Sequence, residues 1–322
     1  MPPSLEPTGA MMTGRQCVVF GGSGFMGSHI VSRLISEGAS VRSLDLAPCP
    51  VAGAESVCGD ITDAALVTSV IEGVDHIYCF AGGLGALRSL EEPVRDLETS
   101  AGAQLVLLEA VRAYAPEASV VFAGSRLEYG TPERLPLSED HPRRPSNPYA
   151  LHKALCSDYY HLYARLYGLH TVVLRLPNPY GPHIVGGPAN AGYGILNLFV
   201  DCAIRCEPIR LYGDGSQLRD FVHVDDVVSA AVAASLTPDA GGRAINIGSG
   251  VGTSLLEAAN LVMTVCGSGT VLTGEPWPLD AASVETGDYY FDISIAREVL
   301  NWAPTVSLEQ GLATLLESAR SR

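Results

Sequence analysis

The chain has 322 residues, of which 47% are hydrophobic and only 17% are charged, so it can bury a sizeable core in one large domain or two interlocked domains. The formal net charge of −15 disfavours nucleic acid and anionic membrane surfaces as partners. Neither a membrane-length apolar run nor a signal-peptide pattern is visible, and residues 1–14 are typical of a flexible tail. We expect a cytoplasmic protein.

The eight cysteines are scattered along the chain, mostly within apolar runs. Only Cys202 and Cys206 lie close together, and no second pair accompanies them as a zinc site would require. We therefore expect free thiols, buried in a protein of the reducing cytoplasm, and no bound metal.

Short apolar runs alternate with helical patterns through the first half of the chain. Strands are expected at 16–20, 40–44, 76–80, 119–123 and 171–176, and helices at 26–37, 63–71, 93–114 and 149–167. Strands that are apolar throughout are typical of a parallel sheet covered on both faces. The order predicts an α/β fold, a doubly wound parallel (Rossmann) sheet, at 15–178.

After Pro177 the pattern changes, because prolines and glycines up to residue 194 interrupt regular structure. Shorter elements follow. We expect 179–322 to be a smaller, mainly substrate-binding region that caps the carboxyl edge of the sheet, where open α/β sheets bind ligands. A segment near 220–236 is expected to return to the first domain.

A glycine-rich turn joins the first expected strand to the first expected helix. Gly22, Gly24 and Gly27 fit G-x-G-x-x-G, and Gly21, Gly24 and Gly27 equally fit G-x-x-G-x-x-G. Such glycines allow a tight turn and bring backbone N–H groups close to a pyrophosphate at the amino end of the helix. The strand before, the helix after and an acid at the end of the second strand favour a dinucleotide site over a purely structural turn.

That acid is Asp45, 18 residues after Gly27. A carboxylate there can accept both ribose hydroxyls of an adenosine and repels a 2′-phosphate. The sequence therefore favours NAD over NADP, although Arg42 is a weaker indication for NADP.

Asp60 lies between the strands expected at 40–44 and 76–80 and has two interpretations. Its carboxylate could accept the adenine amino group, or it could cap the next helix near Thr62 and Asp63. Beside these acids and glycines, the other expected cofactor contacts are Phe25, Met26, Ile61, Tyr149 and Lys153.

Lys153 is the chain's one lysine, and it lies four residues after Tyr149. On a helix these two side chains share a face. A cation beside a phenol favours phenolate and lowers the tyrosine pKa from about 10, as a general base near neutral pH requires. The alternative is a coincidental surface pair.

Ser125 follows the strand expected at 119–123, at the same sheet edge as the glycine turn and 24 residues before Tyr149. Its hydroxyl could bind a substrate oxygen that shares a proton with Tyr149. Alone, such a serine is more often a cap or turn residue.

Together these motifs resemble the extended short-chain dehydrogenase/reductase family, the NAD-dependent epimerases and dehydratases of nucleotide sugars, over roughly 16–312. The matching segments are G-G-S-G-F-M-G, S-R-L-E-Y-G, Y-A-L-H-K, L-R-L-P-N-P-Y-G-P, Y-G-D-G-S-Q-L-R-D-F-V-H-V-D-D and I-N-I-G-S-G. The resemblance implies Ser125, Tyr149 and Lys153 as the catalytic triad. It also implies substrate contacts from Ser125.

For the nucleotide, the resemblance implies a diphosphate held by Asn178 and Arg219, with Tyr212 nearby. A planar guanidinium fork also suits phosphate oxygens on physical grounds. His223, Asp225 and Asp226 are expected to make structural hydrogen bonds between the two parts.

The chain departs from this family at two places. Arg126 and Leu127 stand where sugar-nucleotide 4,6-dehydratases carry an Asp-Glu pair, and decarboxylating relatives also place a glutamate at the position of Leu127. Glu128 is one residue further on and is expected to point elsewhere. Glu285 stands where many relatives have a diphosphate-binding arginine, and this difference weakens the expected binding of the diphosphate.

The leading hypothesis is a nucleotide-sugar (NDP-hexose) 4-epimerase that uses transient hydride transfer to tightly bound NAD and a 4-keto intermediate. The alternatives are an NAD(P)-dependent NDP-4-ketosugar reductase, an NDP-sugar decarboxylase or dehydratase, and a cofactor-binding scaffold without turnover. The helical patterns at 93–114 and 149–167 are apolar around more than one face, which predicts a homodimer with a two-fold four-helix contact.

Overall fold

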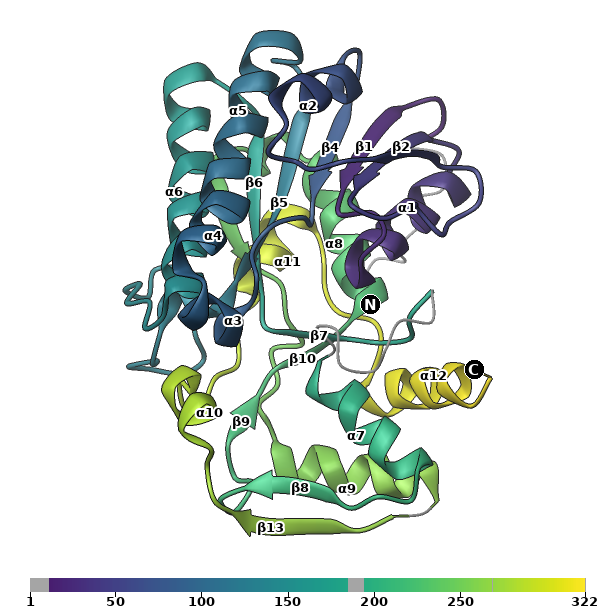
Figure 1. Cartoon of the computed structure of the whole chain (residues 1–322), viewed down its shortest axis with the longest axis vertical. Coiled ribbons are helices and arrows are strands. Elements are labelled where there is room, and N and C mark those ends of the chain that lie inside the picture. Colours follow the sequence, from purple (N-terminus) through teal and green to yellow (C-terminus); the bar gives the residue numbers. More distant parts are fainter. Residues whose placement is uncertain (1–11, 185–193, 268, 322) are drawn as a thin grey trace.

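The computed structural model describes residues 12–184, 194–267 and 269–321 (Figure 1). Most of the tail expected at 1–14, and the middle of the proline- and glycine-rich stretch, lie outside these residues. In the three described ranges, no helix combines the length and the apolarity needed to cross a membrane.

A parallel sheet of seven strands forms the centre of the larger part, in the order β11-β6-β5-β4-β1-β2-β3. The strands are β1 (Gln16–Phe20), β2 (Ser40–Asp45), β3 (Glu55–Cys58), β4 (His76–Cys79), β5 (Ser119–Ser125), β6 (Thr171–Leu176) and β11 (Arg243–Asn246). This sheet confirms the predicted doubly wound fold. The strand order reverses between β1 and β4, so a ligand crevice is expected beyond their carboxyl ends.

Helices cover both faces of this sheet, as strands buried on both sides require. α1 (Phe25–Ser36) and α8 (Val224–Leu236) pack on one face, and α2 (Ala64–Ile71), α5 (Ala103–Tyr114) and α6 (Pro148–Tyr167) cover the other (Figure 1). Successive strand residues alternate between the two cores. Val19 packs in the same cluster as Ile30 of α1, while Val18 packs with Leu107 of α5 and Tyr160 of α6.

The single helix predicted at 93–114 is three segments in the structure. α3 (Ala86–Glu91) precedes it, α4 (Pro93–Leu97) begins with proline at its first position, and a π-helical turn at Glu98–Gly102 leads into α5. A proline is tolerated there because the first N–H of a helix has no partner in the helix. The π turn shifts the helical register by one residue, which the apolar pattern did not reveal.

The smaller part lies beyond the carboxyl edge of the sheet (Figure 1). It contains the strand pairs β7 (Asn178–Tyr180) with β10 (Phe221–His223), β8 (Ile209–Tyr212) with β13 (Val271–Glu275), and β9 (Leu218–Arg219) with β12 (Thr253–Ser254). Its helices are α7 (Ile195–Ile204), α9 (Leu255–Cys266), α10 (Leu279–Val284) and α12 (Leu308–Arg320). Leu196, Val262 and Leu312 belong to its own core.

The chain passes between the two parts more than once. After the strands near Arg219, α8 returns to the sheet and packs against α1, and β11 then pairs with β6 as the edge strand. β11 lies outside the return segment expected near 220–236. α11 (Ser294–Leu300) later contacts α8 and β11 on the same side.

All eight cysteines are free thiols. Cys17, Cys79, Cys156 and Cys266 are buried, and burial raises the pKa of the Cys17 and Cys156 thiols to about 12. The expectation of buried thiols is wrong for Cys58 and Cys206, which are exposed.

Candidate functional site

The glycine turn after β1 leaves no room for side chains. Gly21 has φ of +84°, and a Cβ there would lie 2.8 Å from the Ala81 nitrogen. A Cβ at Gly22 would lie 2.2 Å from Ser43 Oγ, and one at Gly27 only 2.0 Å from the Gly21 carbonyl oxygen. The tight packing brings the backbone of the turn, rather than side chains, to the crevice.

The amino end of α1 faces this turn. Gly24 is its N-cap residue and offers no side chain to the first-turn N–H groups. Phe25 and Met26 begin the helix, and their partly buried side chains pack against the core. Their contribution to a cofactor site would therefore come from backbone N–H groups. Such a helix end attracts the negative charge of a pyrophosphate.

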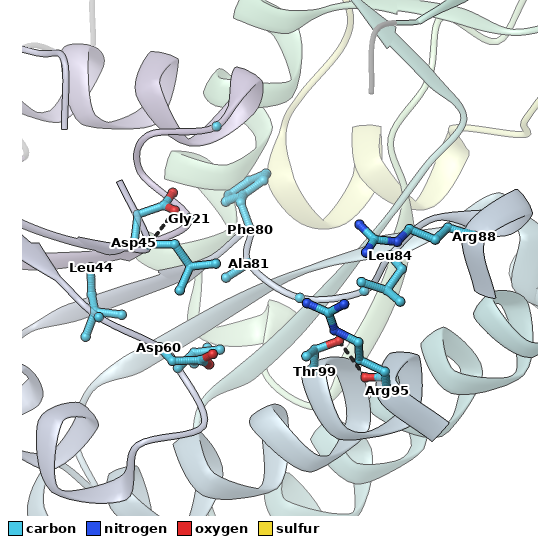
Figure 2. A pocket seen from close by; sticks show the side chains of 16 residues that line it. Gly21, Leu44, Asp45, Asp60, Phe80, Ala81, Leu84, Arg88, Arg95 and Thr99 are labelled. Atoms are coloured by element: carbon cyan, nitrogen blue, oxygen red, sulfur yellow. Dashed lines mark hydrogen bonds between the residues drawn. The ribbon is translucent and has the colours of Figure 1, made fainter. Parts of the chain in front are cut away.

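A cavity of about 370 Å³ opens beside the turn (Figure 2). Figure 2 shows Asp45 and Asp60 on one side of it, and Arg88 and Arg95 on the opposite side. The lining also includes Gly21, Gly24, Leu44, Ile61, Phe80, Ala81, Leu84 and Thr99. The predicted adenosine-side residues thus come together at the ends of β1 to β4.

Asp45 accepts the backbone N–H of Ser23 at 2.9 Å and that of Leu46 at 2.7 Å. These bonds hold the carboxylate on the cavity wall beside the glycine turn. Arg42, the indication for NADP, donates instead to Glu55 at 3.1 Å and to the Val70 carbonyl at 3.0 Å. Its guanidinium is engaged away from the cavity.

The structure distinguishes between the two interpretations of Asp60. The cap of α2 is Asp63, which accepts the N–H groups of Ala65 and Leu66. Asp60 accepts the N–H and hydroxyl of Thr62, both at 2.9 Å, and lies at the cavity. The helix-cap interpretation of Asp60 is therefore wrong.

Tyr149 and Lys153 lie one turn apart at the start of α6. The Lys153 Nζ atom lies 5.9 Å from the Tyr149 ring centroid and 4.6 Å from that of Phe122. It donates to the Ala123 carbonyl at 2.9 Å, and Lys153 is only 6% exposed. The alternative of a coincidental surface pair is therefore wrong for Lys153.

Ser125 is the last residue of β5, two residues after the carbonyl that Lys153 binds. Its Oγ accepts the Leu127 N–H at 3.2 Å and so caps the short 3-10 turn Arg126–Tyr129. The cap interpretation of Ser125 is correct, but the hydroxyl proton is still able to donate to a ligand. Lys153 thus binds β5 two residues before Ser125, and its Nζ is the atom that links this strand end to the Tyr149 ring, 5.9 Å away.

Glu128, which was expected only to point elsewhere, is fully buried. One of its oxygens accepts the Ser125 N–H at 3.0 Å, and the other accepts Ser157 Oγ at 2.8 Å and Arg175 Nε at 3.1 Å. Glu128 therefore joins β5, β6 and α6 behind Ser125 and, as predicted, points elsewhere. Only the S-x-x-E spacing of a capping box could have indicated this role.

A second polar cluster lies where the smaller part meets the end of β5. Arg219 pairs with Glu285, and its Cζ lies 5.1 Å from the Tyr289 ring centroid. Arg126 Cζ lies 3.7 Å from the same centroid. Asn178 Nδ2 donates to the Tyr289 hydroxyl, so Asn178 and Arg219 meet at this tyrosine. Tyr289 was not predicted from the sequence, because no motif around it in the sequence connects it with Asn178 or Arg219.

Tyr212 lies apart from this cluster. It is 38% exposed, packs against Trp277 with centroids 5.1 Å apart, and lines a cavity of about 440 Å³ with Phe199 and Arg210.

The predicted structural residues of α8 connect separate segments. The Asp226 carboxylate accepts the Thr305 N–H at 2.9 Å and the Val306 N–H at 3.1 Å. The Asp225 carboxylate lies 3.7 Å from His29 of α1, and His223 caps α8.

Most of the chain matches one family. A family model described as the NAD dependent epimerase/dehydratase family covers residues 17–248. The chain belongs to this family. It is thus an NAD-dependent enzyme, and the glycine cradle, the uncapped α1 end and Asp45 beside a cavity are the features that fit NAD.

Relatives match along nearly the whole chain. UDP-glucose 4-epimerase of Mycolicibacterium smegmatis is 33% identical over 319 residues, which cover 95% of this chain and 98% of that protein. The structure of the Thermotoga maritima UDP-glucose 4-epimerase with UDP-glucose has a TM-score of 0.85 at 29% identity, covering 95% of this chain and 99% of that one. The Thermus thermophilus UDP-glucose 4-epimerase complex with NAD has a TM-score of 0.83 at 29% identity, with the same coverage.

Proposed function

We propose that this family member is a nucleotide-sugar 4-epimerase that holds NAD tightly and works through a 4-keto intermediate. One observation carries the proposal: Lys153 Nζ binds the Ala123 carbonyl, two residues before Ser125, and lies 5.9 Å from the Tyr149 ring. That ring lies against Gly83, which lines the dinucleotide cavity. The names of the relatives from Mycolicibacterium smegmatis and Thermotoga maritima support the same reaction.

The chain's own residues supply the proton transfers. Tyr149 takes the proton of the sugar 4-hydroxyl as the general base, and the Lys153 Nζ atom lies 5.9 Å from its ring centroid. The Ser125 hydroxyl donates to the same substrate oxygen and positions it. When bound, NAD supplies a hydride acceptor and donor, so the cycle is redox-neutral. After the 4-keto sugar turns over, Tyr149 returns the proton to the 4-oxygen.

The residues around Ser125 do not support elimination or decarboxylation. Leu127 has no group that can transfer a proton, and Arg126 donates to Thr286 and lies on Tyr289. Glu128 is buried in its own ionic network. A 4-ketosugar reductase would use the same triad with Tyr149 as the acid, and it remains the alternative to test.

The test is to incubate the purified enzyme with UDP-, dTDP-, GDP- and CDP-hexoses without added cofactor. We expect one 4-epimer pair to interconvert at constant mass, read by NMR and mass spectrometry, and NAD to copurify with the protein. Consumption of a 4-keto sugar only with added NAD(P)H would identify a reductase. Loss of water or carbon dioxide would identify a dehydratase or decarboxylase.

We also propose that the enzyme is a homodimer. Large apolar side chains on its outer helices are exposed: Leu87, Leu90, Val94, Leu97, Tyr114, Leu151, Leu166 and Tyr167. They come from α3, α4, α5 and α6, which lie side by side on one flank (Figure 1). Contact with the same helices of a second copy would bury them. Leu108, Val111 and Tyr163, which also contribute to the apolar patterns at 93–114 and 149–167, are already buried within the chain.

A further inference from the structure

The guanidinium of Arg219 is almost fully engaged within the chain. One terminal nitrogen donates to the carbonyls of Leu218 at 2.9 Å and Gly287 at 3.0 Å. The other donates to both carboxylate oxygens of Glu285, at 2.7 and 2.6 Å. Within the described part of the chain, only Nε–H has no partner. An incoming anion can reach this Nε–H, but a bidentate contact with the guanidinium also requires the nitrogen that Glu285 occupies.

Glu285 in turn fills a small anion-binding turn. The oxygen that Arg219 holds at 2.7 Å also accepts the Thr286 N–H at 3.1 Å and the Gly287 N–H at 2.8 Å. Consecutive backbone N–H groups beside a guanidinium form the kind of nest that binds phosphate oxygens. Gly287 has φ of +77°, which this turn requires.

The carboxylate is able to leave this turn. The Glu285 side chain is 24% exposed, whereas the Arg219 side chain is 8% exposed. Arg126 lies on the same Tyr289 ring as Arg219, donates to Thr286 and adds a second positive charge to the cluster. With Glu285 displaced, the cluster keeps the charges of two arginines, which matches the charge of a dianionic diphosphate.

We propose that Glu285 is an internal substitute for the substrate's phosphate: it occupies the anion site formed by Arg219, Thr286 N–H and Gly287 N–H, and a diphosphate must displace it to bind. The inference rests on the proposed function, because a nucleotide-sugar substrate carries the diphosphate that the family resemblance implies at Arg219. Binding then exchanges one anion for another. Glu285 therefore lowers the affinity of the enzyme for the nucleotide part of its ligands, in the substrate and also in the product that must leave.

The test removes the negative charge of the Glu285 side chain and keeps its shape. Glu285→Gln should bind UDP about tenfold more tightly than the wild type, the equivalent of one charge-assisted hydrogen bond, in calorimetry with saturating NAD. Glu133→Gln is the matched control, because it changes the net charge equally at an exposed pair with Arg144. It should leave UDP affinity unchanged. In an Arg219→Ala background, the gain from Glu285→Gln should disappear.

Unchanged or weaker UDP binding by Glu285→Gln overturns this inference, and Glu285→Ala gives the same readout if the glutamine variant does not fold. Weaker UDP binding by Arg219→Ala alone would still support a diphosphate at Arg219. If UDP, dTDP, GDP and CDP all fail to bind the wild type and Glu285→Gln, the proposed function and the inference are both wrong.

Discussion

Lys153 donates a hydrogen bond to the carbonyl of Ala123 at 2.9 Å, so the chain's one ammonium group is anchored to the strand that ends at Ser125. The bond fixes where α6 meets β5. It leaves the other donors of Nζ for groups at the sheet edge, and it places a positive charge one helical turn from Tyr149.

Lys153→Arg should lower turnover by at least about 10²-fold although the charge is kept. A planar guanidinium is bulkier than an ammonium and cannot bind the Ala123 carbonyl from the same buried position. Activity is measured on the epimer pair found with the substrate panel, and folding by thermal melting. A fully active, folded arginine variant would show that the compact amine is not needed.

Tyr149→Phe should reduce turnover by about 10²–10⁴-fold, the usual contribution of a positioned acid–base group. The ring remains against Gly83, where the tyrosine lies now, so melting temperature and bound NAD should stay close to wild type. Single-substrate kinetics with NAD quantification separates these effects. Turnover within a few-fold of wild type would remove Tyr149 from the proton transfers.

Asp45→Ala should weaken NAD binding and relax discrimination against NADP, because it removes the carboxylate that we propose accepts the ribose hydroxyls. Calorimetry on cofactor-stripped protein measures both affinities. Arg42→Ala is the control and should leave the NAD preference intact, since Arg42 is bound to Glu55. A wild type that prefers NADP would contradict the role given to Asp45.

Glu128→Ala should destabilise the fold by about 3 kcal/mol, because it leaves the buried Arg175 guanidinium without its counter-ion. Urea denaturation gives this free energy of unfolding. Glu133→Ala, at the exposed pair with Arg144, should change it by less than about 0.5 kcal/mol. Equal, small effects of the two substitutions would show that the buried network contributes little.

Light scattering at micromolar concentration should give twice the chain mass if the exposed helical flank forms a dimer. Leu166→Glu, at a side chain that is 57% exposed, should shift the mass toward that of one chain without loss of folding. A wild-type mass near 33.9 kDa would contradict the dimer and leave the catalytic proposal unaffected.

The features that could be predicted from sequence are local ones. The turn from Gly21 to Gly27 and the helix that carries Tyr149 and Lys153 depend on spacing within a few residues, where helix and strand periodicity act directly. The α/β fold class follows for the same reason. The strand β5 even extends to Ser125, two residues beyond its expected end.

The features that were missed depend on residues far apart in the chain. Arg126 meets Thr286 across 160 positions, and Arg219 meets Glu285 across 66. Such pairs leave no periodic signal, so the sequence indicated only that Glu285 was unusual and not which cation it would bind. β11 was missed similarly, because a short strand at a sheet edge is identified by its partner β6.

The late return of α8 and β11 to the sheet limits how this enzyme could be recombined. A chimaera that kept residues 1–178 and took the remainder from a relative would also import an edge strand and a helix of the cofactor-binding part. Their apolar side chains would then have to fit Ile30 and Val121 of the recipient. The substrate-binding residues of this chain therefore do not form one continuous segment. A successful exchange would need, besides the junction after residue 178, two further junctions that leave 224–246 in place.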